Sequence, residues 1–154
     1  MSITVDTSLT SDYAIRGAVA ADASAVFSLL QQLADTYTPN LGAFEESFAE
    51  CVSGSTDASI IVAVDGVGAV RGYALITVNR LLHTNGSSAQ LQELVVDAEW
   101  RGSGLGSALV EHIERVCRER DVKQLTVASR RSAGFYERMG YRSTADFLKR
   151  TFED

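Results

Sequence analysis

The chain has 154 residues, of which 45% are hydrophobic and 22% are charged, which is typical of one compact domain spanning residues 1–154. Its formal net charge of −6 argues against nonspecific binding of nucleic acid. No apolar stretch is long enough to span a bilayer, and residues 1–11 lack the pattern of a signal peptide. We therefore expect a cytoplasmic protein with no membrane partner.

The charges are distributed unevenly along the chain. Residues 1–76 hold two cations and nine acids, whereas residues 77–154 hold twelve cations and eleven acids. The second half is therefore the better place for a polyanionic ligand. The two cysteines, Cys51 and Cys117, lie far apart and lack the spacing of metal ligands, so we expect neither a metal site nor a disulfide framework.

The first third of the sequence predicts a strand followed by two helices. Residues 13–19 alternate in the manner of a strand. Asp22 can cap a helix whose apolar stripe is Val26, Leu29, Leu30 and Leu33. Residues 37–40 contain the only proline and break this helix. A second helix then carries Phe44 and Phe48 one turn apart.

The middle of the sequence predicts three strands. Residues 59–64 and 69–78 form a hairpin around the turn signal Asp65-Gly66-Val67-Gly68. Residues 83–88 form a polar loop, and residues 91–97 form the next strand.

The last third predicts an amphipathic helix over residues 105–118 and a buried strand over residues 124–128. A short helix over residues 132–139 ends at Gly140, and residues 141–147 form a final strand. The whole order, β-α-α-β-β-β-α-β-α-β, indicates an α/β (α+β) domain with a mixed sheet flanked by helices.

The strongest signal is a glycine-rich turn between a strand and a helix, Arg101-Gly102-Ser103-Gly104-Leu105-Gly106. The first amides of a helix lack internal partners and lie at the positive end of the helix dipole. Glycines allow a phosphate to approach the backbone, so this turn suits a pyrophosphate, and Arg101 can add a charge-assisted contact. Neither a P-loop nor a dinucleotide fingerprint fits, because Ser107 stands where the first needs lysine and the second needs glycine.

A second motif follows about thirty residues later, with Phe135-Tyr136 followed by three residues and then Gly140-Tyr141. The first motif, read as Arg-x-x-Gly-x-Gly, and this second one resemble the two signatures of the GNAT superfamily of N-acetyltransferases. The resemblance implies a mixed, mostly antiparallel central sheet of six or seven strands, flanked by about four helices.

The resemblance also implies that acetyl-CoA is the acetyl donor. The positions that it assigns to cofactor binding are Leu94, Val95, Val96, Arg101, Gly102, Ser103, Gly104, Leu105, Gly106, Ser107, Ser129 and Tyr136. Many members of the family carry Asn and Ala where this chain has Ser129 and Ser132. Members of the family splay the strand that precedes the glycine turn from the next strand, and the freed backbone pairs with the pantetheine arm. The oxyanion donor is then a backbone amide of Leu94, Val95 or Val96.

Acetyl transfer to an amine needs a base, an oxyanion donor and an acid for the leaving thiolate. Glu93 is the candidate base, since in an extended strand it shares an apolar face with Leu91 and Val95. It acts directly or through a water. The alternatives are a salt-bridged or solvent-facing Glu93, and His83 as the base.

Tyr136 is the candidate acid, because the resemblance places its hydroxyl at the sulfur of coenzyme A. The alternative is a purely packing role in the short helix. Arg130 and Arg131 either contact an anionic group or lie in solvent.

The function predicted from these residues is acetylation of a primary amine of a small molecule. The stretch Gln92-Glu93-Leu94-Val95-Val96 resembles a bacterial subgroup of small-amine acetyltransferases, which includes aminoalkylphosphonate acetyltransferases. Two alternatives stay open: a protein or peptide N-acetyltransferase, and a non-catalytic acyl-CoA-binding module on the same fold. Homodimers are common in the family, and a homodimer is equally open here.

Overall fold

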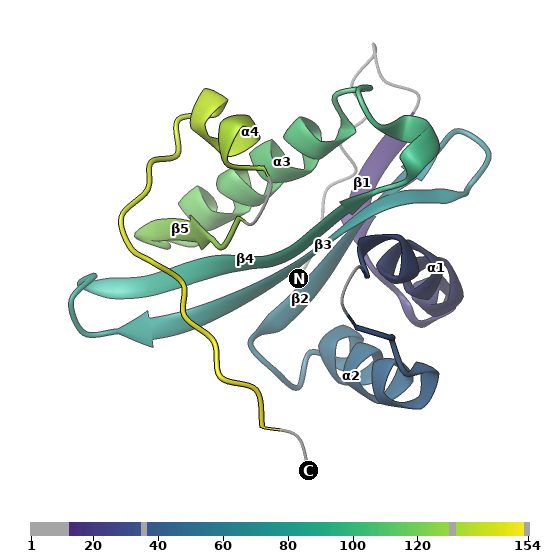
Figure 1. Ribbon diagram of the computed structural model, residues 1–154, viewed down its shortest axis with the longest axis horizontal. Coiled ribbons are helices and arrows are strands. Elements are labelled where there is room, and N and C mark those ends of the chain that lie inside the picture. The colour runs from purple at the N-terminus through teal and green to yellow at the C-terminus, as the bar shows by residue number, and fades with distance from the viewer. Residues whose placement is uncertain (1–12, 35–36, 130–131, 153–154) are drawn as a thin grey trace.

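The computed structural model describes residues 13–34, 37–129 and 132–152 (Figure 1). The longer elements, in chain order, are β1 (Tyr13–Gly17), α1 (Ala23–Leu33), α2 (Leu41–Ser53), β2 (Ala58–Asp65), β3 (Val70–Leu81), β4 (Gly86–Val96), α3 (Leu105–Glu119), β5 (Gln124–Val127) and α4 (Ala133–Arg138). Among the described residues, none of the helices is long and apolar enough to cross a membrane.

The strands form one sheet in the order β1-β2-β3-β4-β5. Neighbouring strands are antiparallel except β4 and β5, which are parallel. Helices α1 and α2 cover one face of the sheet, and α3 and α4 lie on the other (Figure 1). The mixed, mostly antiparallel sheet with flanking helices is thus confirmed.

Each face of the sheet has its own apolar core. On the α3 side, the residues that are less than 2% exposed are Ile61, Ala63, Ala74, Ala89, Leu105, Leu109, Val110 and Ile113. On the α1 and α2 side, the buried residues are Val26, Leu29, Phe48, Val62, Tyr73 and Val95. The two sets come from alternate positions of β2 and β3, as the side-chain period of a strand requires.

The described residues form five strands rather than six or seven, because the strand predicted over residues 141–147 does not form. Gly140 adopts a positive φ of 96° at the end of α4, and the amide of Tyr141 donates to the carbonyl of Tyr136. The Tyr141 hydroxyl then donates to Glu114 Oε2 of α3 at 2.6 Å. This anchor on α3 directs the chain away from the sheet, and residues 142–152 are exposed.

The prediction of a polar loop over residues 83–88 was also wrong. Strands β3 and β4 continue through this region as a hairpin, with Ser87 opposite Arg80 and Ser88 opposite Asn79. The turn is confined to residues 82–85, where Asn85 has a φ of 57°. Backbone pairing supports these residues without apolar side chains, so the hydropathy pattern missed them.

Asp22 precedes α1 as predicted but does not cap it with its side chain. Its carboxylate accepts two hydrogen bonds from the Arg16 guanidinium, at 2.7 and 3.0 Å, and one from the Val19 amide at 2.8 Å. Burial alone would raise the pKa of Asp22, but the hydrogen bonds from Arg16 and Val19 outweigh it and lower the pKa. The pair therefore fixes β1 to the start of α1.

We expect Asp22→Asn to lower the free energy of unfolding by about 2 kcal/mol at neutral pH, since it removes a charge that is bound by Arg16. Because the pKa of Asp22 is lowered in the folded state, its contribution is present above about pH 4 and is lost as the pH falls through the folded value. Urea denaturation of both proteins at several pH values checks this.

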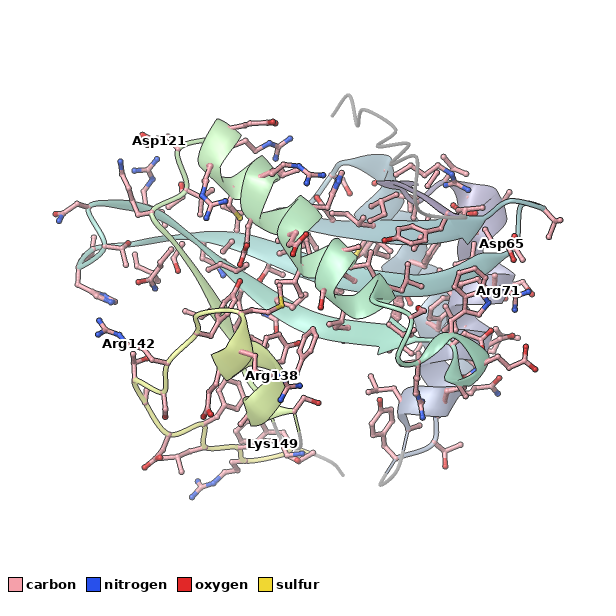
Figure 2. The ribbon with its side chains drawn as sticks, turned by 90° about the horizontal axis from the view of Figure 1, so that it is seen from above. Asp65, Arg71, Asp121, Arg138, Arg142 and Lys149 are labelled. Atoms are coloured by element: carbon pink, nitrogen blue, oxygen red, sulfur yellow. The ribbon has the colours of Figure 1, made fainter. Side chains whose placement is uncertain are left out.

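The matched control is Asp121→Asn, since Asp121 is 87% exposed in its pair with Lys123 and should contribute almost nothing (Figure 2). A difference between Asp22→Asn and the parent protein that stays constant down to pH 3 would contradict the assignment of the pair.

Candidate functional site

Strand β4 is paired with β5 over only part of its length. The parallel pairing joins Ser88–Leu91 to Gln124–Val127, and residues 92–96 have no β5 partner among the described residues. The Asp97 amide donates to the Arg71 carbonyl of β3 at 2.8 Å. Because peptide groups alternate along a strand, those of Val95 also face β3, whereas those of Leu94 and Val96 face the open edge. Among the described residues, this edge is a row of donors and acceptors that no strand pairs.

A β-bulge at Gln92 changes the side-chain alternation within β4. Leu91 lies opposite Ile76 and Glu93 lies opposite Leu75, so Gln92 is an extra residue. Leu91 is therefore buried on the α3 face, whereas Glu93 and Val95 lie on the α1 and α2 face. The prediction that Glu93 shares a face with Leu91 was wrong, because it assumed an uninterrupted strand; the shared face with Val95 is confirmed.

The Glu93 carboxylate has a defined partner in Tyr73, whose hydroxyl donates to Glu93 Oε1 at 2.6 Å. Tyr73 lies opposite Val95, so the two groups are diagonal neighbours on adjacent strands. Tyr73 is 2% exposed. Burial, and then the charge of Glu93, raise the pKa of Tyr73 far above its ordinary value, so its hydroxyl remains a donor. Among the described residues Glu93 forms no salt bridge, and its hydrogen bond to Tyr73 means that the carboxylate is not free in solvent.

Glu93 also lines a cavity of about 280 Å³ between α1, α2 and the sheet. The lining residues are Val26, Leu30, Tyr37, Pro39, Asn40, Ala43, Phe44, Ser47, Phe48, Cys51, Ile60, Tyr73, Leu75 and Glu93. Phe44 lies between Phe27 and Phe48, with ring centroids 5.0 and 5.5 Å away. The cavity offers room for an acceptor beside a carboxylate.

The glycine turn lies on the opposite side of the sheet, at the start of α3. Gly102 and Gly104 have φ angles of 81° and 88°, and residues 101–104 are exposed. Gly104 precedes the first helical residue, Leu105, which is 1% exposed and anchors the helix in the core. The amides of Leu105, Gly106 and Ser107 are the first of the helix and lie at its positive end. The anion cradle is predicted at this helix start, and the exposed Arg101 lies just before it in the chain.

Arg71 binds the residues that lead into this turn. The sequence did not reveal this role of Arg71. Its guanidinium donates to Asp65 Oδ2 at 2.8 Å and Asp97 Oδ2 at 3.1 Å. It also lies 5.8 Å from the centre of the Trp100 ring, so the guanidinium packs on this ring. Figure 2 shows Asp65 and Arg71 together at one end of the sheet. The available signal was that Arg71 is one of only two cations in the first 76 residues.

Helix α4 packs beside the glycine turn and the open edge of β4. A methyl group at Gly106 would lie 3.6 Å from Phe135 Cζ and 3.7 Å from Val96 Cγ2, so these three residues converge. Tyr136 is 7% exposed, and its ring makes edge contacts with Phe135 and Tyr141 at 4.9 and 5.7 Å. Among the described residues its hydroxyl makes no hydrogen bond. Burial raises the pKa of Tyr136, which keeps it protonated as an acid must be.

The other predicted residues lie elsewhere. Ser129 Oγ accepts from the Ser132 amide at 3.1 Å, so this hydroxyl already supports the turn into α4. Arg130 and Arg131 lie outside the described residues. His83 lies in the exposed β3–β4 turn, seven strand positions or more from Glu93, which places it roughly 20 Å away. It does not line the cavity.

Comparison with known proteins agrees with this geometry. A family model described as an acetyltransferase (GNAT) domain matches residues 56–143, which is more than half of the chain. The chain therefore belongs to the GNAT acetyltransferase family. The matched region begins before β2 and contains β4 with its open edge, the glycine turn and α4.

Individual relatives are more distant. The chain is 30% identical over 79 residues to GCN5-related N-acetyltransferase 2, chloroplastic, of Arabidopsis thaliana, which is 51% of this chain and 31% of that protein. The chain thus spans less than half the length of the curated relatives it matches.

Two solved structures have a TM-score of 0.78 to this chain and cover 92% of it. They are an acetyltransferase of Trypanosoma brucei, 22% identical and covered in full, and glucosamine-6-phosphate N-acetyltransferase of Arabidopsis thaliana, 23% identical and 99% covered. At these identities the likeness establishes the fold.

We expect Gly104→Ala to lower the free energy of unfolding by about 1 kcal/mol, because an alanine at a φ of 88° is strained although nothing lies within 4 Å of its side chain. Gly106→Ala is the matched control. Its methyl group meets ordinary contacts at 3.6 Å and beyond, and alanine favours a helix, so stability should be kept or improved. Urea denaturation compares them, and equal losses would contradict this account of the turn.

Proposed function

We propose that this protein transfers the acetyl group of acetyl-CoA to the primary amine of a small molecule by direct attack. The observation that carries the proposal is the open edge of β4 over residues 92–96. The glycine turn and Tyr136 lie on one side of this edge, and the Glu93 cavity lies on the other. Donor and acceptor can therefore approach the same stretch of backbone from opposite faces of the sheet.

The residues present suit coenzyme A in three places. The outward peptide groups of Leu94 and Val96 can pair with the amides of a pantetheine arm. The first amides of α3 can bind a pyrophosphate, and Arg101 can add a charge-assisted hydrogen bond. The bound donor supplies an acetyl thioester, and the chain itself provides the groups that move protons.

Each step of the acetyl transfer can then be assigned to a residue of the chain. Glu93 accepts a proton from the attacking amine, directly or through a water, as the nitrogen forms a bond to the acetyl carbon. An outward amide of Leu94 or Val96 stabilises the oxyanion. Tyr136 donates its proton to the sulfur as the carbon–sulfur bond breaks. Tyr73 keeps the Glu93 carboxylate oriented through the 2.6 Å hydrogen bond and acts as a positioning residue.

We expect Tyr136→Phe to lower kcat for amine-dependent thiol release by about 100-fold or more, the scale of a lost general acid. The affinity for acetyl-CoA, measured by calorimetry, should change little. Tyr141→Phe is the matched control, since its hydroxyl bonds Glu114 on α3 and its loss should affect stability rather than kcat. Equal activity of Tyr136→Phe and the parent protein would remove the acid role.

We expect Glu93→Gln to lower kcat/KM for the amine by about 100-fold near neutral pH. The glutamine carbonyl can still accept from Tyr73, so the cavity should keep its shape. The residual activity should rise as the pH increases, because more of the amine is then neutral without help from a base. A pH profile of Glu93→Gln that is parallel to that of the parent protein would assign the base elsewhere.

The alternative functions predict different results in the same assays. A non-catalytic acyl-CoA-binding module would bind acetyl-CoA and release no thiol with any amine. A peptide N-acetyltransferase would acetylate peptide N-termini in preference to small amines.

A further inference from the structure

Among the residues that the structure describes, a single charged side chain lines the acceptor cavity. Of its fourteen described lining residues, Glu93 is the only acid, and none is a lysine, arginine or histidine. Most of the others are aliphatic or aromatic. Asn40 and Ser47 are the uncharged polar side chains apart from the tyrosines and Cys51. The cavity is therefore an apolar chamber with one acid at its wall.

Two of the polar groups of this chamber already have partners within the protein. Asn40 Oδ1 accepts from the Ala43 amide at 2.8 Å and caps α2. The Tyr73 hydroxyl donates to Glu93 Oε1, and the pKa of Tyr73 is raised, so it adds no negative charge. Glu93 is the one acid among the described lining residues, and its carboxylate suits an ammonium or amine nitrogen.

We infer that the acceptor is a small primary amine carried on an uncharged apolar body, such as an arylalkylamine or a branched alkylamine. This inference rests on the proposed function and names its acceptor. The amine nitrogen lies at Glu93, and the apolar body packs among Phe44, Phe48 and Leu75. A cavity of about 280 Å³ is at the low end of the range for drug-sized ligands, roughly 300–1,000 Å³.

The same chamber disfavours acceptors with a second charge. A carboxylate, phosphate or phosphonate on the acceptor would meet no cation among the lining residues described. A second ammonium, as in a polyamine, would find no second acid among the described lining residues, since Glu93 is already used. An unpaired charge that leaves water costs several kcal/mol, so each such acceptor should be rejected strongly. Aminoalkylphosphonates and sugar phosphates are thus poor candidates despite the short sequence resemblance.

The experiment compares matched acceptors with the full chain and acetyl-CoA. 2-Phenylethylamine and phenylalanine differ by one carboxylate, and pentylamine and 1,5-diaminopentane differ by one amine. We expect kcat/KM for the first member of each pair to exceed that of the second at least tenfold, and 2-aminoethylphosphonate to be the poorest. A peptide beginning with phenylalanine extends the panel. Equal or better turnover of the peptide or of any doubly charged acceptor overturns the inference and leaves the proposed function standing.

A charge inserted in the cavity gives a second test. Ser47→Arg adds a cation to an exposed lining position of α2, and should raise the kcat/KM of phenylalanine relative to 2-phenylethylamine at least fivefold. Ser28→Arg adds the same charge to an exposed position of α1 outside the cavity lining and should leave the ratio unchanged. An unchanged ratio in Ser47→Arg contradicts the placement of the acceptor body.

Binding separates this inference from the proposed function. Calorimetry with 2-phenylethylamine, in the presence of coenzyme A, should show binding that Glu93→Gln weakens, even if no acetyl group is transferred. Binding without turnover supports the inference and overturns the proposed function. If neither 2-phenylethylamine nor pentylamine binds or is acetylated, the inference is wrong, whether or not another amine is turned over.

Discussion

The extra residue Gln92 determines how the two halves of the candidate site meet. A regular strand would place Leu91, Glu93 and Val95 on one face. The bulge leaves Leu91 in the core beneath α3 and turns Glu93 toward α1 and α2. Gln92 itself stays at the surface, where its side-chain amide donates to Thr77 Oγ1 at 2.9 Å. One inserted residue thus gives β4 an apolar anchor on one side and a carboxylate on the other.

Strand β4 can remain unpaired with β5 beyond Leu91 because other contacts hold β4 in place. Along its other edge β4 pairs with β3 from Gly86 to Val96, so β4 keeps its course after its pairing with β5 ends at Leu91. Arg71 extends this support past the end of the strand by binding Asp97, and Gln32 of α1 accepts from the Ala98 amide at 3.0 Å. The open edge and the glycine turn are therefore held in a fixed relation. A ligand that bridges them does not have to order either one, which lowers the cost of binding.

Local signals were enough to predict part of this site from sequence. The glycine turn and the Phe135-Tyr136 motif depend on neighbouring residues, because positive φ angles and helix ends are decided within a few positions. The bulge could not be predicted, since a period-two pattern assumes that no residue is inserted. Arg71 and Asp97 are 26 positions apart, and Tyr73 and Glu93 are 20 apart. Arg71 and Asp65 are 6 apart across a hairpin. Only the fold reveals these contacts. The segment after Gly140 alternated like a strand, but Tyr141 found its partner on α3.

The acidic residues of the first half of the chain have a different role in the structure than the sequence composition suggests. The first half of the chain is strongly acidic, which by itself suggests a site for polycations. In the structure the acids of this half that bind cations do so within the protein, as Asp22 does with Arg16 and Asp65 with Arg71. Among the described residues that line the cavity formed by α1 and α2, the only acid is Glu93, which comes from the second half. The cavity therefore selects its acceptor mainly by rejecting charges that it cannot pair, and less by attractive contacts. Rejection of an unmatched charge needs no dedicated residue.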